Sequence, residues 1–164
     1  KCAGTCDKAK SKYKYSGNED CVSAMSVPGG GPKACSFGCT GFGSCVKVCD
    51  FDAIHVINGV AVVDKEKCVA CGKCVATCPK SLIELVPYAA PHKAAIHTAD
   101  EELTKEFGKA VKEVCSAGCI GCKMCTRVCE ADAITVENNI AKIDYSKCTG
   151  CGKCAEKCPA KIIL

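Results

Sequence analysis

The chain has 164 residues, a formal net charge of +4 and 20 cysteines, whereas aromatic residues make up 5% of it and tryptophan is absent. This composition excludes an ordinary core of large apolar side chains, so bonds to sulfur must supplement the packing. We find neither a secretory signal nor an apolar stretch of membrane-spanning length, and we therefore expect thiolate ligation of metal rather than a disulfide scaffold.

The first segment in chain order, residues 1–34, contains Cys2, Cys6 and Cys21, which are one ligand short of a four-coordinate site. Its basic stretch "DKAKSKYKY" is interpreted as a solvated surface, with a docking patch for an acidic partner such as a ferredoxin as the alternative. The glycines of "SVPGGGPKAC" form a connector, because the phosphate-binding Lys-Ser/Thr pair of a nucleotide loop is missing.

The following segments, 35–85 and 115–164, repeat each other at a constant offset, the one that relates Cys39 to Cys119. The repeated cysteines are Cys39, Cys45, Cys49, Cys68, Cys71, Cys74 and Cys78, which recur as Cys119, Cys125, Cys129, Cys148, Cys151, Cys154 and Cys158. Each segment contains the pattern C-x2-C-x2-C-x3-C-P, which is typical of bacterial ferredoxins. We therefore predict an α+β protein with two tandem 2[4Fe-4S] ferredoxin-like domains, joined by a linker at 86–114.

In ferredoxins of this type, the first three cysteines of a run hold one cluster and the fourth holds the other. This rule predicts three complete ligand sets. They are Cys119, Cys122, Cys125 and Cys158; Cys129, Cys148, Cys151 and Cys154; and Cys49, Cys68, Cys71 and Cys74. A fourth set is incomplete, because Phe42 stands where the other unit has Cys122, and Cys39, Cys45 and Cys78 lack a partner.

The remaining cysteines can be grouped in two ways. The favoured grouping places Cys35 with Cys39, Cys45 and Cys78, and places Cys115 with Cys2, Cys6 and Cys21. It divides all 20 cysteines into five sets of four and predicts four [4Fe-4S] clusters and a fifth. The alternative is a fifth site of Cys2, Cys6, Cys21 and Cys35, a [3Fe-4S] cluster at the incomplete set, and a spare Cys115. In a third interpretation the three cysteines of residues 1–34 bind zinc or no metal.

Regular structure is expected between the cysteine loops. Residues 53–64 and 133–144 each predict two short strands around a turn, at Asn58-Gly59 and at Asn138-Asn139. Short helical turns are expected after Cys45, Cys74 and their repeats.

The linker predicts an amphipathic helix that begins at Thr98. Thr98 and Glu101 have the spacing of a capping box, and Leu103, Phe107, Val111 and Val114 share one face. We expect this face to pack on a ferredoxin-like domain.

The stretches "KCAGTC", "EDCVSAM", "PGGGPKACSFGC", "VKVCDFDAI" and "CSAGCIGCKMC" together resemble the B subunit of Rnf electron-transport complexes, over essentially the whole chain. That family also has an N-terminal membrane helix and a further cluster-binding domain, so the chain resembles its soluble C-terminal part. Asp50 and Glu130 depart from the proline that usually follows the fourth cysteine.

The resemblance implies an iron–sulfur subunit that relays single electrons from reduced ferredoxin into a membrane-bound, ion-translocating ferredoxin:NAD+ oxidoreductase. Its partners would be ferredoxin and the other Rnf subunits, and its place the cytoplasmic face of the cell membrane. Association with the membrane would come through the missing N-terminal helix or the partner subunits.

No acid–base pair, nucleophile or nucleotide loop is recognisable, so we expect no catalytic site in this chain. Because a cubane with four thiolates carries about −2, five of them would bring the net charge to about −6, which argues against a nucleic-acid partner. Two other functions stay open. One is an electron-input subunit of a hydrogenase, formate dehydrogenase or similar oxidoreductase, and the other is a zinc-dependent interaction module.

Overall fold

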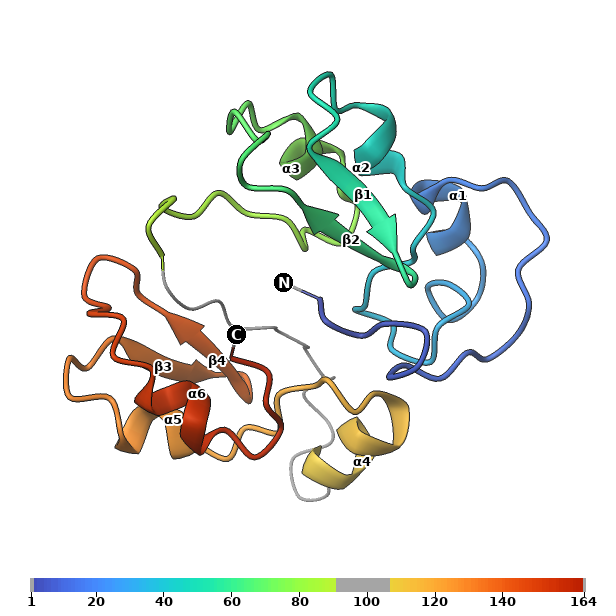
Figure 1. Cartoon of the computed structure of the whole chain (residues 1–164). Coiled ribbons are helices and arrows are strands. Elements are labelled where there is room, and N and C mark those ends of the chain that lie inside the picture. Colours follow the sequence, from blue (N-terminus) through green and yellow to red (C-terminus); the bar gives the residue numbers. More distant parts are fainter. Residues whose placement is uncertain (1, 91–106, 164) are drawn as a thin grey trace. The chain divides into compact units, whose positions relative to one another are not determined.

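The computed structural model describes residues 2–90 and 107–163. The chain divides into two compact units, Cys2–Leu85 and Val86–Leu164. Within the described residues, each unit contains one two-stranded antiparallel sheet and several short helices (Figure 1). The predicted α+β class is confirmed.

The first unit is built around a β-hairpin. Its elements are α1 (Cys21–Met25), α2 (Ser44–Lys47), β1 (Ile54–Ile57), β2 (Val60–Val63) and α3 (Lys73–Thr77). In the hairpin, Ile54 lies opposite Val63 and Ile57 opposite Val60. The two turn residues have positive φ angles, 47° at Asn58 and 75° at Gly59, as a tight two-residue hairpin loop requires. The hairpin predicted from these residues is confirmed.

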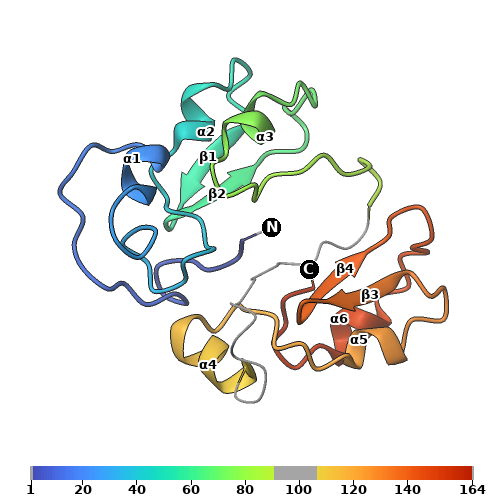
Figure 2. The ribbon, with the colours of Figure 1, turned by 180° about the vertical axis from the view of Figure 1, so that it is seen from behind.

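The second unit repeats this arrangement. Its elements are α4 (Phe107–Val114), α5 (Met124–Arg127), β3 (Ile134–Glu137), β4 (Ile140–Ile143) and α6 (Lys153–Lys157). β3 pairs with β4 around Asn138-Asn139, again as predicted. Helices α5 and α6 contact each other, and α5 contacts β3, so the two cysteine-bearing helices lie together beside the hairpin (Figure 2).

The short helices at the cysteines share one way of beginning. The residue before each of α2, α3, α5 and α6 has a left-handed backbone conformation. At Gly72 and Gly152, which precede α3 and α6, φ is 79° and 77°. Such a residue reverses the chain between two cysteines of a loop, and glycine adopts it without steric cost. The helical turns predicted at Cys45, Cys74 and their repeats are confirmed, and each begins just before its cysteine.

The protein core is small, as the composition predicts. In the first unit Ala53, Ile54 and Val60 are buried, and Ile54 is the largest side chain with less than 2% exposure in the described residues. The second unit buries Ala133, Ile134, Ile140, Ala141, Ile162 and Ile163. Seven cysteines are buried as well: Cys21, Cys35, Cys45, Cys115, Cys119, Cys125 and Cys154. The thiols therefore form a substantial part of each interior.

Helix α4 is the described part of the amphipathic helix predicted from Thr98. Residues 98–106, with the expected capping box and Leu103, lie outside the described residues. On α4, Val111 and Val114 are half-buried, whereas Lys112 and Glu113 are exposed, so the amphipathic character of this part is confirmed. Among the helices of residues 2–90 and 107–163, we find none that is long and apolar enough to cross a membrane.

Candidate metal centres

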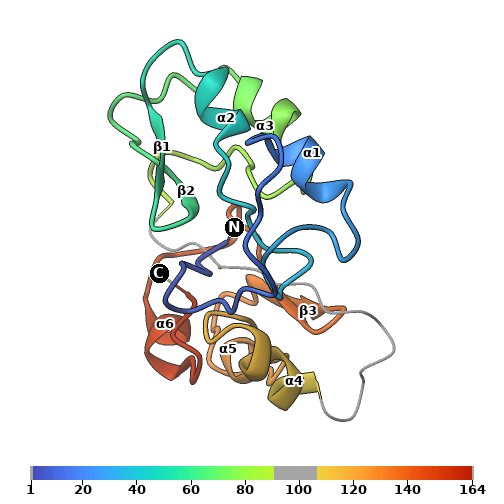
Figure 3. The ribbon, with the colours of Figure 1, turned by 90° about the vertical axis from the view of Figure 1, so that its right-hand side faces the viewer.

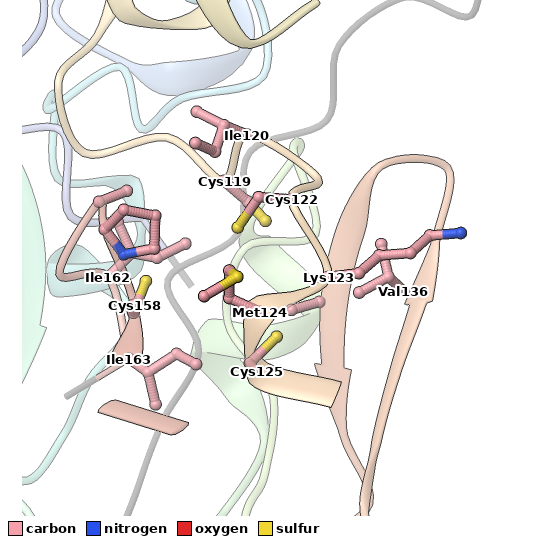
Figure 4. A pocket seen from close by; sticks show the side chains of 13 residues that line it. Cys119, Ile120, Cys122, Lys123, Met124, Cys125, Val136, Cys158, Ile162 and Ile163 are labelled. Carbon is pink, nitrogen blue, oxygen red and sulfur yellow. The ribbon is translucent and has the colours of Figure 1, made fainter. Parts of the chain in front are cut away.

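Four cysteines of the second unit line one hollow. They are Cys119, Cys122, Cys125 and Cys158, and Figure 4 shows their sulfur atoms around the same space. The hollow is partly open to solvent, and Ile120, Val136, Ile162 and Ile163 contribute to its apolar wall. Ligands of a single zinc ion would converge at about 2.3 Å from it. Thiols that line one hollow without converging on a single point suit a cluster of several atoms better.

Cys125 is a buried thiol of this group. Its side chain is 7% exposed. Burial raises the pKa of Cys125 to about 11, and the nearby Cys119 and Cys122 thiols raise it as well. This thiol is thus protonated at neutral pH, and metal binding must displace its proton. Among the described residues, no three or more Cys, His, Asp or Glu side chains converge closely enough to hold a single metal ion.

Each C-x2-C-x2-C loop brings its own thiols together. Burial raises the pKa of Cys74, and the charges of Cys68 and Cys71 contribute to the increase. The same relation holds at the equivalent residues of the second unit, where burial and then Cys148 and Cys151 raise the pKa of Cys154. The structure therefore gathers the three loop cysteines of two predicted ligand sets.

The fourth predicted ligand of these sets reaches the loop from the preceding half of each unit. In the first unit, the Asp50 ion pair raises the pKa of Lys73, and the charges of Cys71 and Cys49 add to the increase. Cys49 and Cys71 thus lie around one lysine. In the second unit, Lys153 pairs with Glu130, the residue after Cys129, and the Ala133 N–H donates to Cys129 Sγ at 3.3 Å.

In the incomplete set of the first unit, as in the hollow of the second, a buried thiol has a raised pKa and other thiols lie around it. Burial raises the pKa of Cys45 to about 11, and the charges of three further thiols contribute to the increase. These are Cys39, Cys21 and Cys78. The structure therefore brings together Cys39, Cys45 and Cys78, and it adds a cysteine from α1.

Cys35 is buried near the side chain of Lys80. Burial lowers the pKa of Lys80, and the charges of Cys35, Cys39 and Cys2 counteract this effect, so all three thiols lie near the Lys80 ammonium group. Cys2 is close to the backbone of Cys39, whose N–H donates to Cys2 Sγ at 3.4 Å.

The other two cysteines belong to different units. Cys6 is exposed, and its N–H donates to the carbonyl of Asn58 in the hairpin turn at 2.9 Å. Cys115 is 2% exposed and directly follows α4 in the second unit, where its N–H donates to the Val111 carbonyl at 2.8 Å.

Comparisons with known proteins agree with these centres. An LdpA Fe-S cluster-binding domain matches residues 32–89, and a 4Fe-4S dicluster domain matches residues 118–162. Over 99% of its length, the chain is 47% identical to the B subunit of the Na(+)-translocating ferredoxin:NAD(+) oxidoreductase complex of Acetobacterium woodii. The chain is a homologue of Rnf complex B subunits.

Two further relatives of this Rnf family come from other organisms. The chain is 42% identical to the B subunit of the proton-translocating ferredoxin:NAD(+) oxidoreductase complex of Clostridium ljungdahlii, and 39% identical to the B subunit of the ion-translocating oxidoreductase complex of Methanosarcina acetivorans. Both matches cover 99% of the chain. The chain spans 47%, 56% and 60% of the lengths of the Acetobacterium, Clostridium and Methanosarcina proteins. The resemblance to Rnf B subunits is confirmed, as is the presence of [4Fe-4S] cluster-binding domains.

Proposed function

We propose that this homologue of Rnf B subunits relays single electrons from reduced ferredoxin into a membrane-bound, ion-translocating ferredoxin:NAD+ oxidoreductase complex. The observation that carries the proposal is the apolar hollow lined by Cys119, Cys122, Cys125 and Cys158. Each [4Fe-4S] cluster, when bound, accepts and returns one electron. Four thiolate ligands leave no open position for a substrate, so this arrangement favours electron transfer over catalysis.

The proposed architecture is two tandem 2[4Fe-4S] ferredoxin-like domains, at 35–85 and 115–164, preceded by the cysteine-containing segment 1–34. Four clusters use the motif cysteines, and the remaining cysteines supply a fifth. The complete ligand sets are those around Cys119, Cys129 and Cys49 that the swapped-ligand rule predicts. The repeated left-handed residues before α2, α3, α5 and α6 support this assignment, since they wrap all four cysteine loops in the same way.

The chain's own residues would bind the clusters and control their surroundings. The cysteines would lose their protons and hold iron, and Ile120, Ile162 and Ile163 would shield the apolar side of the second-unit site from water. A drier site makes added negative charge more costly, so these side chains influence the reduction potential.

The proposed partners are ferredoxin and the other Rnf subunits, at the cytoplasmic face of the cell membrane. Support comes from the names of two relatives, which are subunits of ferredoxin:NAD(+) oxidoreductase complexes. Hydride transfer to NAD+ needs a two-electron carrier such as a flavin. That step is therefore assigned to other subunits of the complex.

The test is rapid mixing of the purified, cluster-loaded chain with reduced ferredoxin under anaerobic conditions. The visible absorbance of the chain should bleach as it takes up electrons, and added salt should slow the reaction if charged surfaces guide the encounter. The flavin-free chain should form no NADH. Formation of NADH would overturn the relay proposal, and failure to accept electrons from ferredoxin would favour a subunit of a hydrogenase or formate dehydrogenase. Zinc without acid-labile sulfide would favour the interaction module.

A further inference from the structure

The first unit lacks a cysteine at residue 42, where the second unit has Cys122. Phe42 has a packing role instead. Its ring lies against the ring of Tyr15, with centroids 5.0 Å apart and planes tilted by 52°. The side chain thus anchors part of residues 1–34 to the cysteine loop, and a fourth ligand for this loop must come from another residue.

Cys21 is held against this loop by its backbone. It is the first residue of α1, and its N–H donates to Ser44 Oγ at 2.8 Å. Ser44 begins α2 and directly precedes Cys45. A second hydrogen bond joins α2 to the chain just before α1, since Lys47 Nζ donates to the Glu19 carbonyl at 3.1 Å. In Figure 3, α1, α2 and α3 lie at one end of the first unit.

The start of α1 is itself well defined. The Asp20 carboxylate accepts hydrogen bonds from the N–H groups of Val22 at 2.9 Å and Ser23 at 3.0 Å, which is a typical N-cap. Cys21 is 8% exposed and Ala24 on the same helix is fully buried, so α1 turns these residues into the unit. The position of the Cys21 thiol therefore follows from a capped helix and two hydrogen bonds to α2.

The surroundings of the Cys21 thiol point to the vacant motif position. The thiol interacts with the side chains of Ser44 and Thr40 and with the backbone of Ser44 and Phe42. The sulfur thus lies near Phe42, the residue that replaces the motif cysteine.

The two units differ at the residues whose side chains contact the Cys21 thiol. Thr40 and Ser44 of the first unit correspond, at the offset of the repeat, to Ile120 and Met124. In the second unit these positions line the apolar hollow, and Cys122 comes from the loop itself. The two hydroxyl residues thus occur in the unit whose loop lacks its own motif cysteine, and they lie beside Cys21, which comes from outside the loop.

We propose that Cys21 is the fourth ligand of the cluster held by Cys39, Cys45 and Cys78, in the role that Cys122 has in the second unit. The inference rests on the proposed function, because it assumes clusters in the ferredoxin-like domains. On binding, the Cys21 thiol gives its proton to solvent and one S–Fe bond forms, without a change in the oxidation state of iron. Cys35 would then not be a ligand of this cluster, although it lies near Lys80 together with Cys2 and Cys39.

The test uses the full chain, loaded with iron and sulfide anaerobically, and three single variants: Cys21→Ala, Cys35→Ala and the control Cys122→Ala. Iron content and the EPR spectrum of the oxidised protein are measured. We expect the Cys21 and Cys122 variants to behave alike. Each should either show a three-iron signal or lose one cluster. The Cys35 variant should leave the Cys39 cluster intact. Persistence of the signals of the other clusters shows that a variant has folded.

A double variant, Cys21→Ala with Phe42→Cys, strengthens the test. It puts a cysteine where Cys122 stands in the second unit, so it should restore the four-iron cluster that Cys21→Ala loses. A three-iron signal from Cys35→Ala, with an unchanged spectrum for Cys21→Ala, would overturn this inference and leave the relay function standing. Absence of acid-labile sulfide in the unaltered chain would overturn both.

Discussion

Lys73 and Asp50 form an ion pair, and Lys153 and Glu130 form the equivalent pair in the second unit. Each acidic residue directly follows a predicted ligand, Cys49 or Cys129, and each lysine directly precedes another, Cys74 or Cys154. The acids occupy the position where ferredoxins usually have proline. The ion pairs thus connect the two parts of the chain that the swapped-ligand rule assigns to one cluster.

Removing this ion pair should have a small effect on stability. The side chains of Lys73 and Asp50 are 55% and 61% exposed, and solvent screens exposed ion pairs so that they contribute little to stability. For Asp50→Asn we therefore expect the urea midpoint of unfolding of the cluster-loaded protein to stay close to that of the unaltered chain, measured under anaerobic conditions. Glu130→Gln is the equivalent variant in the second unit and should behave in the same way. A clear fall in the midpoint would show that the pair has a larger role than its exposure indicates.

The ligand swap predicts damage at a distance along the sequence. Cys49→Ser should disturb the cluster on Cys68, Cys71 and Cys74, although Cys49 belongs to the preceding motif. EPR spectra that resolve the individual clusters of the reduced protein measure this effect. Cys129→Ser should act in the same way on the cluster of Cys148 in the second unit. If the damage were confined to the cluster of Cys39 and Cys45, the pairing rule would not hold here.

Two glycines with the same backbone conformation should respond differently to substitution. Gly59 has φ of +75° and Gly72 has +79°, so alanine is strained at both, by about 1–2 kcal/mol. A Cβ at Gly59 would lie 2.5 Å from Cys6 Sγ, whereas one at Gly72 would have no neighbour within 4 Å. Gly59→Ala should therefore destabilise by about 1–3 kcal/mol more than Gly72→Ala, as overpacking does. Melting temperatures of the two variants compare these effects, and equal losses would argue against the contact with Cys6.

Removal of iron should unfold the chain. The apolar core is small, and ligation of iron couples the cysteine loops to folding. After treatment with an iron chelator, we expect loss of the cooperative thermal transition and of far-UV circular dichroism. The same treatment with iron-saturated chelator is the control. A sharp transition in the iron-free protein would show that the side-chain packing is sufficient.

The repeated elements were predictable because each depends on residues close together in the sequence. Asn58-Gly59 defines a tight turn, and the flanking residues form the two strands of the hairpin. Likewise, the ferredoxin spacing identified Cys119, Cys122, Cys125 and Cys158 as one set, and these residues line one hollow. Most of the fold could therefore be predicted from the residues of the turns and from the strict sequence repeat.

The position of Cys21 was not predictable in the same way. It is distant from Cys45 in the sequence and belongs to no repeat, and the two are joined through a side chain, Ser44. The available signal was the pair of polar residues, Thr40 and Ser44, where the other unit has Ile120 and Met124. A comparison of residue types at equivalent positions could have revealed it, whereas cysteine spacing alone could not.

The contacts of Lys33 limit how the chain can be shortened. Lys33 is 7% exposed, and its ammonium group donates to the carbonyls of Gly4 at 3.0 Å and Gly59 at 2.7 Å. A truncated protein that starts at residue 35 would keep every cysteine of the first ferredoxin motif but lose this link between the chain's beginning and the hairpin turn. The motif is therefore shorter than the compact unit Cys2–Leu85, which includes the residues that Lys33 joins.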